Sequence, residues 1–262
     1  MRGVWAIVEL DLKRFLQERA RLFAGLMQPL LYLFVLGAGL GASIQHGGVD
    51  YRKFIFPGVV GLALLFTATF AAISIVFDRQ IGFFKAVLVS PVSRSAIGVG
   101  KVLAGALQAL MQGVVLLFFA PLVHVHLGLV EVLAMLGAML LAALTFSAIG
   151  VALASRFTST TVFPIMSNAV LLPMFFMSGA MYPLQPAPHW LRMLAHLDPV
   201  AYAVDLMRQA LLGSGPEIAF FPVWQDVVVL VGVTLALTWA AVRVFARGEE
   251  VNLGPSAFPW RK

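Results

Sequence analysis

Six long apolar runs, none with a charged residue in its core, constrain this chain more than any other feature of its sequence. A run of about 20 apolar residues can cross the roughly 30 Å hydrocarbon core of a bilayer as a helix. The runs therefore predict an all-α integral membrane protein in which residues 1–262 form a single transmembrane domain. We expect the six transmembrane helices at 22–43, 57–77, 102–123, 132–154, 162–182 and 227–245.

The distribution of basic residues predicts that both the N- and C-termini are cytoplasmic. With a cytoplasmic N-terminus, 14 of the 18 Lys and Arg residues fall in or beside segments on the cytoplasmic side, whereas the 12 acidic residues divide 6 and 6. An excess of Lys and Arg marks cytoplasmic loops, and acidic residues contribute little to orientation. Six crossings then return the C-terminus to the side on which the chain began.

Composition excludes several other classes of protein. At 61% hydrophobic and 11% charged residues, the chain lies far from the averages for soluble domains. Basic loops lying against an anionic leaflet account for the net charge of +6, and no Lys/Arg cluster combines with aromatic residues as a nucleic-acid surface would. There is no cysteine, and the five histidines are scattered, so we expect neither a disulfide nor a metal site.

Residues 3–20 differ from the apolar runs because their hydrophobic residues lie on one helical face. This pattern predicts an interfacial helix at the membrane surface, with an ordinary soluble helix as the alternative. The mixed charges of residues 1–21, and the length of the run that follows, argue against a signal peptide. We place the apolar face on Trp5, Val8, Leu12, Phe15 and Leu16, and the polar face on Asp11, Arg14, Gln17, Glu18 and Arg21.

The long outer segment, 183–226, contains signals for two short amphipathic helices. Pro188 can occupy the first turn of a helix that runs through Leu197. Asp198 and Pro199 form an N-cap and first-turn pair for a second helix, which is expected to reach Leu212 and stop at the following glycine. We expect both helices to dip into the outer membrane interface.

No Asp, Glu, Lys, Arg or His lies in the middle of any predicted span. Gradient-driven carriers and ion channels usually place such groups, or ordered carbonyls, at membrane depth. A polar translocation path could be built from Gln108 and Gln112, which share a helical face, together with Asn168. The alternative is that these amides form hydrogen bonds between helices, each worth about 0.6 kcal/mol.

The inner loop 78–101 combines basic residues with aromatic residues. Its sequence predicts a short helix at 82–89 that stops before Pro91 and exposes Phe83, Phe84, Val87 and Leu88. Exposed aromatics in such a loop suit either a protein partner or the lipid interface, and the residues alone favour neither.

Two blocks of sequence form motifs at the inner loop and at the exit of the fifth span. The first block comprises Asp78, Arg79, Gly82, Phe83, Lys85, Ser90, Pro91, Val92, Ser93, Arg94, Gly100 and Lys101. The second comprises Ser178, Gly179, Tyr182, Pro183, Pro188, Trp190, Asp198, Pro199, Tyr202, Asp205 and Arg208. Together they resemble the type-2 family of ATP-binding-cassette (ABC) exporter permeases, the group that exports drugs, polysaccharides and nodulation factors. Within the first block, Gln80 stands where the family usually has Glu, and an amide cannot form the ion pair that the Glu carboxylate would.

The resemblance implies a permease that pairs with a second copy of itself as a homodimer and docks two separate ABC ATPase subunits. It also implies that the two outer helices are re-entrant, that the protein resides in the plasma membrane (the bacterial inner membrane), and that ATP and Mg bind in the partner, with no cofactor in this chain. The pattern Gly-x4-Gly-Lys-Ser/Thr, which a P-loop ATPase needs, is absent from the sequence. The coupling helix implied for ATPase docking contains Asp78, Arg79, Gly82, Phe83, Phe84, Lys85, Val87, Leu88, Ser90, Pro91 and Arg94.

The function expected from this resemblance is outward transport of a hydrophobic, lipid-like, drug-like or glycan substrate. Two alternatives remain open. A membrane-embedded enzyme would need clustered acids and histidines, and only the outer segment with His189, His196, Asp198 and Asp205 approaches this. A pore or gradient-driven carrier would transport without nucleotide.

Overall fold

A bundle of long helices makes up the protein, whose computed structural model describes residues 2–41, 45–46, 49–81, 94–123, 125, 128–215 and 218–246. Within these ranges the one sheet is a short antiparallel ladder of β1 (Gln45–His46) with β2 (Val49–Asp50). In the part of the chain that the structure describes, five helical stretches are long and apolar enough to cross a membrane, which makes the chain a multi-pass membrane protein. They are Arg19–Gly37, Tyr51–Gln80, Ser95–Leu122, Leu129–Ala154 and Val223–Arg243.

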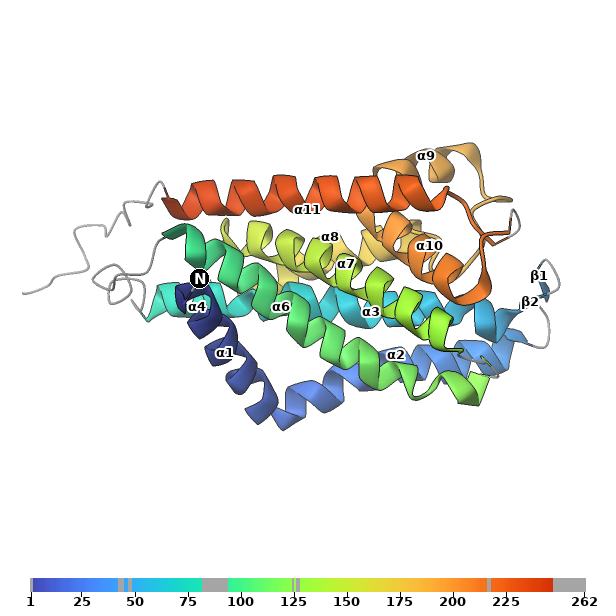
Figure 1. The fold of residues 1–262 in the computed structure, drawn as a ribbon, viewed down its shortest axis with the longest axis horizontal. Helices are drawn as coiled ribbons and strands as arrows, with labels where there is room; N and C mark the ends of the chain where they lie inside the picture. The colour runs from blue at the N-terminus through green and yellow to red at the C-terminus, as the bar shows by residue number, and fades with distance from the viewer. Residues whose placement is uncertain are drawn as a thin grey trace, which may run out of the picture.

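The helix α3 (Tyr51–Ala71) forms the centre of the bundle (Figure 1). It packs against α2 (Arg19–Gly41), α6 (Arg94–Leu117), α7 (Leu129–Ala154) and α10 (Pro199–Leu212), and most of its side chains are buried. The helix α11 (Val223–Ala246) lies along α7 and α6, with much of its surface exposed. A central helix that is apolar on all sides therefore organises the core, whereas α2 and α11 turn apolar faces outward, as lipid-facing helices do.

Small residues allow the central helices to approach closely. A Cβ atom added at Gly150 of α7 would lie 2.6 Å from the Cα of Thr69 on α3. Because only glycine fits such a backbone contact, Gly150 fixes the packing of α7 on α3. The hydroxyl of Thr69 donates a hydrogen bond across the same junction to the carbonyl of Phe146, 3.4 Å away.

The helix α3 begins earlier than the sequence predicted, at Tyr51 rather than at residue 57. The carboxylate of Asp50 caps it by accepting a hydrogen bond from the backbone N–H of Arg52 at 3.0 Å. The Arg52 side chain then donates to the carbonyl of Gly37 on α2. The polar residues just before position 57 suggested a loop, but they form the first turns of the helix. They can do so because Asp50 caps the helix and the carbonyl of Gly37 on α2 accepts a hydrogen bond from Arg52.

At its other end this span continues as α4 (Ile73–Gln80) after a single turn at Ala72. The inner loop was expected to begin at Asp78, so this boundary was wrong by about one helical turn. The helix extends to Gln80 because Asp78, Arg79 and Gln80 all form ion pairs or hydrogen bonds with neighbouring segments. The predicted coupling helix at 82–89 lies outside the described residues.

The helix α8 (Val162–Met177) is shorter than the span expected at 162–182. Its 16 residues measure about 24 Å at a rise of 1.5 Å per residue, less than the roughly 30 Å of the hydrocarbon core. The chain leaves the helix at Ser178 and turns at Gly179, which adopts a positive φ of 72°. The structure therefore ends this apolar helix before the turn.

The predicted N-terminal helix is present as α1 (Arg2–Gln17), which meets α2 in a V-shaped elbow at Glu18 (Figure 1). Val8 and Phe15 are buried against the bundle, whereas Trp5 is 67% exposed. Asp11 had been assigned to the polar face, but it is buried, with 5% of its surface exposed. That assignment was wrong because Asp11 contributes to an ion cluster at the junction of three helices.

The two outer helices form as predicted, as α9 (His189–Leu197) and α10. Asp198 caps α10 by accepting a hydrogen bond from the N–H of Val200 at 2.9 Å, and Gly213 ends it with a φ of 88°. Asp205, Arg208 and Gln209 are polar, yet all three are buried. The reason is that α3, α7 and α11 enclose α10, so it has no solvated face.

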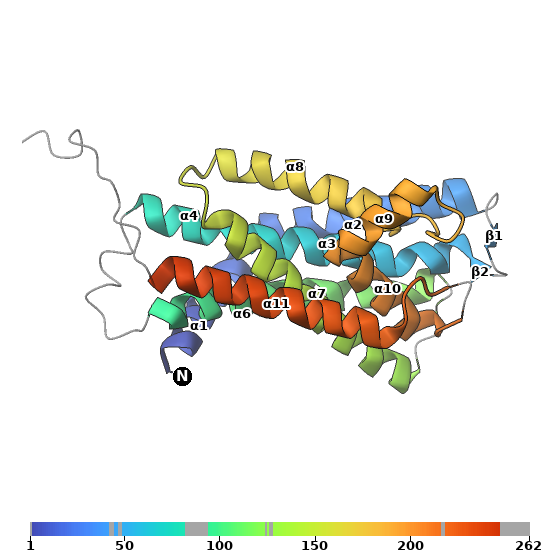
Figure 2. The ribbon, with the colours of Figure 1, turned by 90° about the horizontal axis from the view of Figure 1, so that it is seen from above.

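The elements divide between two ends of the bundle (Figures 1 and 2). The start of α1, the end of α4, the start of α6 and the end of α11 share one end, which we call the inner end. The β1–β2 ladder, α9 and α10 lie at the opposite, outer end. Successive long helices thus run in opposite directions between the two ends, as expected of a chain that crosses a membrane repeatedly.

Candidate functional site

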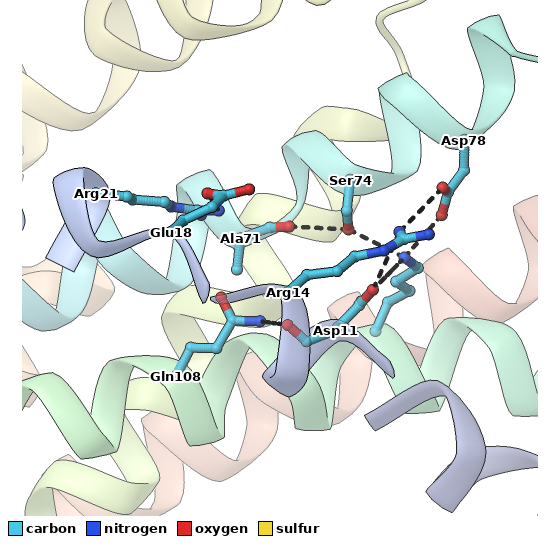
Figure 3. Close-up of polar contacts among 9 residues, drawn as sticks. Asp11, Arg14, Glu18, Arg21, Ala71, Ser74, Asp78 and Gln108 are labelled. Carbon is cyan, nitrogen blue, oxygen red and sulfur yellow. Dashed lines mark hydrogen bonds and ion pairs between the residues drawn. The ribbon is translucent and has the colours of Figure 1, made fainter. Parts of the chain in front are cut away.

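Five side chains from α1, α4 and α6 meet at the inner end and are called here the inner ion cluster (Figure 3). Two carboxylates, one lysine and one arginine give the cluster no net formal charge. Its members are Asp11, Arg14, Ser74, Asp78 and Lys101.

Lys101 of α6 is the centre of the cluster. Its Nζ lies 2.9 Å from Oδ2 of Asp11 on α1 and 3.0 Å from Oδ2 of Asp78 on α4. A third contact, at 3.0 Å, joins Nζ to the hydroxyl of Ser74, which donates in turn to the carbonyl of Ala71. An ammonium group has three N–H donors, so Lys101 is fully hydrogen-bonded. The Lys101 side chain thus connects α1 to α4 and α6.

Arg14 completes the cluster on its exposed side. Its Nη1 lies 3.4 Å from Oδ1 of Asp78 and 3.9 Å from Oδ1 of Asp11, and 41% of its side chain is exposed. Asp11, Asp78 and Lys101 are each less than 10% exposed. Burying such charges costs free energy that only their mutual contacts offset, and removing one partner from a buried pair typically costs 3–5 kcal/mol. The cluster therefore strongly favours the arrangement in which α1, α4 and α6 are together.

The last two residues of α4 attach it to a fourth segment, the connection 155–161 between α7 and α8. Arg79 donates through Nη1 to the carbonyls of Ser155 and Phe157, at 3.4 and 3.2 Å. These carbonyls follow the end of α7, where backbone acceptors lack helical partners. Gln80 donates to the carbonyl of Thr158 at 3.0 Å and accepts from the hydroxyl of Thr160 at 3.2 Å.

The end of α4 is therefore a junction that contacts three other parts of the bundle. Asp78 connects it to α1 and α6, and Arg79 with Gln80 connects it to the α7–α8 connection. The chain continues from α4 directly into the inner loop. A displacement of that loop would act first on this junction and then on all the helices bound to it.

A cavity of about 320 Å³, which we call the inner cavity, opens beside the cluster. Its wall combines charged and apolar side chains and includes Gln108, whose Nε2 donates to the carbonyl of Asp11 at 3.3 Å. The wall consists of Asp11, Arg14, Phe15, Glu18, Arg21, Ala71, Ile73, Ser74, Phe77, Gln108 and Thr160. Such a surface could contact both the polar and the apolar part of an amphiphilic molecule.

At the outer end, buried polar side chains hold α10 in place. The carboxylate of Asp205 accepts from the backbone N–H groups of Phe220 and Phe221, at 2.9–3.1 Å. Arg208 donates to the carbonyl of Gly179 at 2.8 Å, and its Nη1 lies 3.8 Å from Oδ1 of Asp205. Asp205 and Arg208 thus form an i, i+3 ion pair, and both also bind neighbouring backbone.

Two further features of the outer end concern its titratable groups. Burial raises the pKa of Asp198 from 3.8 to about 7, against the opposing effect of its hydrogen bond from Val200. Tyr202 donates its hydroxyl to the carbonyl of His196 and stacks on Phe221 with ring centroids 4.1 Å apart. Among the described residues no group of three acids or histidines could hold a metal ion.

Comparison with known proteins identifies the family. A family model described as ABC-2 type transporter matches residues 2–212. The chain belongs to the ABC-2 type transporter family. Nodulation protein J of Rhizobium leguminosarum bv. viciae is 31% identical over 201 residues, which cover 74% of this chain and 76% of that protein. The same-named protein of R. leguminosarum bv. trifolii is 32% identical over 200 residues, covering 74% of this chain and 75% of that protein.

A more distant relative has a name that states its activity. The putative transport permease ycf38 of Porphyra purpurea is 27% identical over 195 residues, covering 72% of this chain and 67% of that protein. Together with the family match, this relative makes the chain a transport permease of the membrane rather than an enzyme.

Within this ABC-2 type permease, most residues predicted to dock the ATPase lie outside the described part of the chain. Gly82, Phe83, Phe84, Lys85, Val87, Leu88, Ser90 and Pro91 belong to that undescribed stretch, and of Arg94 only the backbone, at the start of α6, is described. Asp78 is 3% exposed and bound to Lys101 and Arg14, so in this structure it joins helices instead of facing a partner. Its direct docking role stays a prediction, as do those of the undescribed residues.

The predicted path residues separate in the structure. Gln108 lines the inner cavity, whereas Gln112 lines a second cavity and accepts a hydrogen bond from the hydroxyl of Thr67 at 3.0 Å. Asn168 on α8 is half-buried and lines neither cavity. Both glutamines therefore form hydrogen bonds between helices, which was the alternative to a role in a translocation path.

The exposed residues of the outer helices form an apolar surface. Pro188 occupies the N-cap position of α9, and Trp190 is 62% exposed beside Met193 and Leu197. Tryptophan is enriched where a protein meets the membrane–water interface. This surface suits contact with the outer interface.

Sequence reasoning missed Asp11 and Arg14 as site residues, although one signal was present. Asp11 lies between Val8 and Phe15 at helical spacing, which places it on the buried face and not opposite to it. A carboxylate at a buried position needs a cation, and Lys101 at the start of the third span is a suitable partner.

Proposed function

We propose that this chain is the membrane-spanning subunit of an ATP-driven exporter, whose partner ATPase subunits move the loop that follows α4. The observation that carries the proposal is the junction at the end of α4. Asp78, Arg79 and Gln80 connect the start of the loop to α1, α6 and the α7–α8 connection. The family match supports an ABC ATPase as the source of energy.

The arrangement in the membrane follows from the same proposal. Both termini face the cytoplasm of a bacterial cell, and the inner end of the bundle, with its basic residues, lies at the inner leaflet of the plasma membrane. The helix α8, extended by the segment 178–182 toward the outer surface, is the fifth of six crossings, and α9 and α10 re-enter from outside. Two copies of the chain pair, and each docks one ATPase subunit that binds ATP and Mg.

The mechanism is a transfer of movement through buried polar contacts. When the ATPase subunits close on ATP, they press on the loop, and α4 moves with it. Because the inner ion cluster makes separation of α1, α4 and α6 costly, these helices move together and do not let α4 slide past them. Buried polar networks resist gradual deformation, so the bundle switches between discrete arrangements.

An amphiphilic cargo fits the inner cavity best. Arg14, Glu18 and Arg21 offer charge on one part of its wall, and Phe15 with Phe77 offers aromatic surface on another. Lipid-like, drug-like and glycan-bearing molecules all combine such parts, so we propose export of a substrate of this broad class.

Affinity purification from native membranes, followed by reconstitution, tests the proposal. We expect a tagged chain to retain an ABC ATPase in a 1:1 ratio, and ATP hydrolysis by that ATPase to increase when both are placed in liposomes. Charge reversal at Lys85 and Arg94 should remove this retention, while charge reversal at the outer residues Arg52 and Lys53 should not. Transport by the purified chain in vesicles without nucleotide would refute ATP-driven coupling.

A further inference from the structure

Two buried carboxyl groups meet at the outer end, where α10 packs against the first turn of α11 (Figures 1 and 2). Asp205 on α10 is 2% exposed, and Asp226 on α11 is fully buried, with 0% exposed. The side-chain amide of Gln209 joins them, because its Nε2 lies 3.1 Å from Oδ2 of Asp205 and 2.8 Å from Oδ2 of Asp226. We call these three side chains the outer clasp.

The Gln209 amide has more acceptors than hydrogens. Its Nε2 also donates to the backbone carbonyl of Phe221 at 2.9 Å, which fixes the orientation of the amide, since its own oxygen could not face another carbonyl. The two N–H bonds of the amide therefore serve three oxygen atoms. One of these oxygens is left without a hydrogen of its own, and among the three groups only a carboxyl can bind a proton to supply it.

Asp205 has enough donors to stay ionised. Its oxygens accept from the backbone N–H groups of Phe220 and Phe221 at 2.9–3.1 Å, and Nη1 of Arg208 lies 3.8 Å from its Oδ1. Hydrogen bonds and a nearby cation both favour the charged form of a carboxyl group. The negative charge of the outer clasp therefore resides on Asp205.

Asp226 has no comparable support. Its Oδ1 is buried without a hydrogen-bond partner, and its Oδ2 has only a share of the Gln209 amide. The helices α6, α7 and α10 all pack against α11, yet across the described ranges they place no Lys, Arg or His nitrogen within ion-pair distance of Asp226. Asp226 is thus a buried acid without a counter-ion.

The other titratable groups of this region make contacts of their own. Tyr202 on α10 donates its hydroxyl to the carbonyl of His196. The His196 ring packs against Phe220 and Phe221, with centroids 5.5 and 5.1 Å apart, and its Nδ1 lies 2.7 Å from the carbonyl of Arg192. Neither side chain neutralises Asp226.

An ionised carboxylate in such a position costs so much free energy that the group takes up a proton instead. Two carboxylates that share one site also oppose the ionisation of both. Because Asp205 is stabilised as an anion, the proton belongs on Asp226. A proton needs no cavity, so full burial of the group is compatible with its binding.

We propose that Asp226 binds one proton at neutral pH, and that this proton holds α11 against α10 and makes the outer end sensitive to pH. With Asp226 neutral, Gln209 bridges one anion and one uncharged acid. When Asp226 loses the proton, two carboxylates repel each other across a single amide, and the first turn of α11 moves away from α10. A carboxyl group that is protonated when folded and ionised when unfolded contributes stability at low pH that is lost as pH rises. Acid therefore keeps the outer clasp closed, and alkali loosens it.

Infrared spectroscopy of the full chain in liposomes tests for the proton itself, because a carboxylic acid absorbs apart from a carboxylate. Asp198→Asn is the background for the measurement, since Asp198, with a pKa of about 7, would add a signal of its own. We expect a carboxylic-acid band at pH 7 that Asp226→Asn removes. Glu131→Gln, which removes a half-buried acid from the first turn of α7, should leave this band intact. Absence of the band, or a band that survives Asp226→Asn, would overturn the proposal.

Distances between spin labels test the movement of α11. The sequence has no cysteine, so Leu197→Cys, directly before α10, and Val228→Cys on α11 provide unique labelling sites at side chains that are 82% and 60% exposed. In the same Asp198→Asn background, we expect a longer distance at pH 9 than at pH 6. Asp226→Asn, whose amide cannot ionise, should show one distance at both pH values. A distance that does not depend on pH, or an equal change in Asp226→Asn, would contradict the clasp. Neither measurement involves nucleotide or a partner, so the outcome is independent of ATP-driven export.

Discussion

Replacing Lys101 with methionine should destabilise the protein by about 3–5 kcal/mol. The substitution keeps an unbranched apolar side chain but removes the Nζ that lies 2.9–3.0 Å from Asp11, Asp78 and Ser74. Two carboxylates, each about 95% or more buried, then face each other with only the half-exposed Arg14 as a counter-ion. Breaking a buried ion pair by removing one partner typically costs this much because the remaining charge is uncompensated.

The free energy of unfolding in detergent, measured by denaturant titration, checks this value. Lys13→Met is the matched control, because Lys13 lies on α1, the helix of Asp11, and forms an exposed pair with Glu9. Exposed pairs contribute about 0–1 kcal/mol, so the control should change stability by no more than that. Combining Lys101→Met with Asp11→Asn and Asp78→Asn should recover more than half of the loss, since no buried carboxylate then lacks its cation. A Lys101→Met variant as stable as the control would refute the reasoning.

Three further predictions concern other parts of the bundle. Gly150→Ala should destabilise by about 1–3 kcal/mol because its Cβ would meet the α3 backbone, whereas Gly137→Ala on the same helix, with open space around it, should stabilise by about 0.5–1 kcal/mol; equal effects in thermal unfolding would contradict the close contact. Asp198 has a folded pKa of about 7, above its unfolded value of 3.8, so its contribution to the stability of the folded protein falls as pH rises from 4 to 7. Asp198→Asn should therefore be more stable than the wild type at pH 8, by an amount on the order of a few kcal/mol that shrinks toward pH 5. A difference in stability that stays constant with pH would disprove this prediction. Gln80→Glu removes the donor to the Thr158 carbonyl and should lower stability by about 1 kcal/mol; unchanged unfolding would show that this contact contributes nothing.

The sequence predicted best what depends on local composition. Apolar runs located the five long spans, and the Asp198–Pro199 pair with Gly213 located α10 at both ends. Both signals act within a few residues, through hydrophobicity and capping. The early start of α3 at Tyr51 was missed, since the partner of Arg52 is a carbonyl on another helix.

Contacts between side chains that are distant in the sequence could not be predicted from it. Lys101 and Asp11 are 90 positions apart, and the local sequence around neither residue predicts that the two side chains are in contact. The assignment of Asp78 to ATPase docking rested on the family resemblance, whereas its burial depends on helices α1 and α6. Likewise, Gln80 departs from the Glu usual in the family, and the structure gives the amide both a donor and an acceptor role that a carboxylate would not combine.

The central claim is that the end of α4 transmits the movement of partner ATPase subunits to the bundle. The most direct test is the ratio of cargo exported to ATP hydrolysed in liposomes that contain the permease and its ATPase. Arg79→Ala removes the contacts of α4 with the carbonyls of Ser155 and Phe157. We predict that this variant still binds the ATPase and supports ATP hydrolysis but exports several-fold less cargo per ATP. Export per ATP equal to that of the wild type would contradict the account.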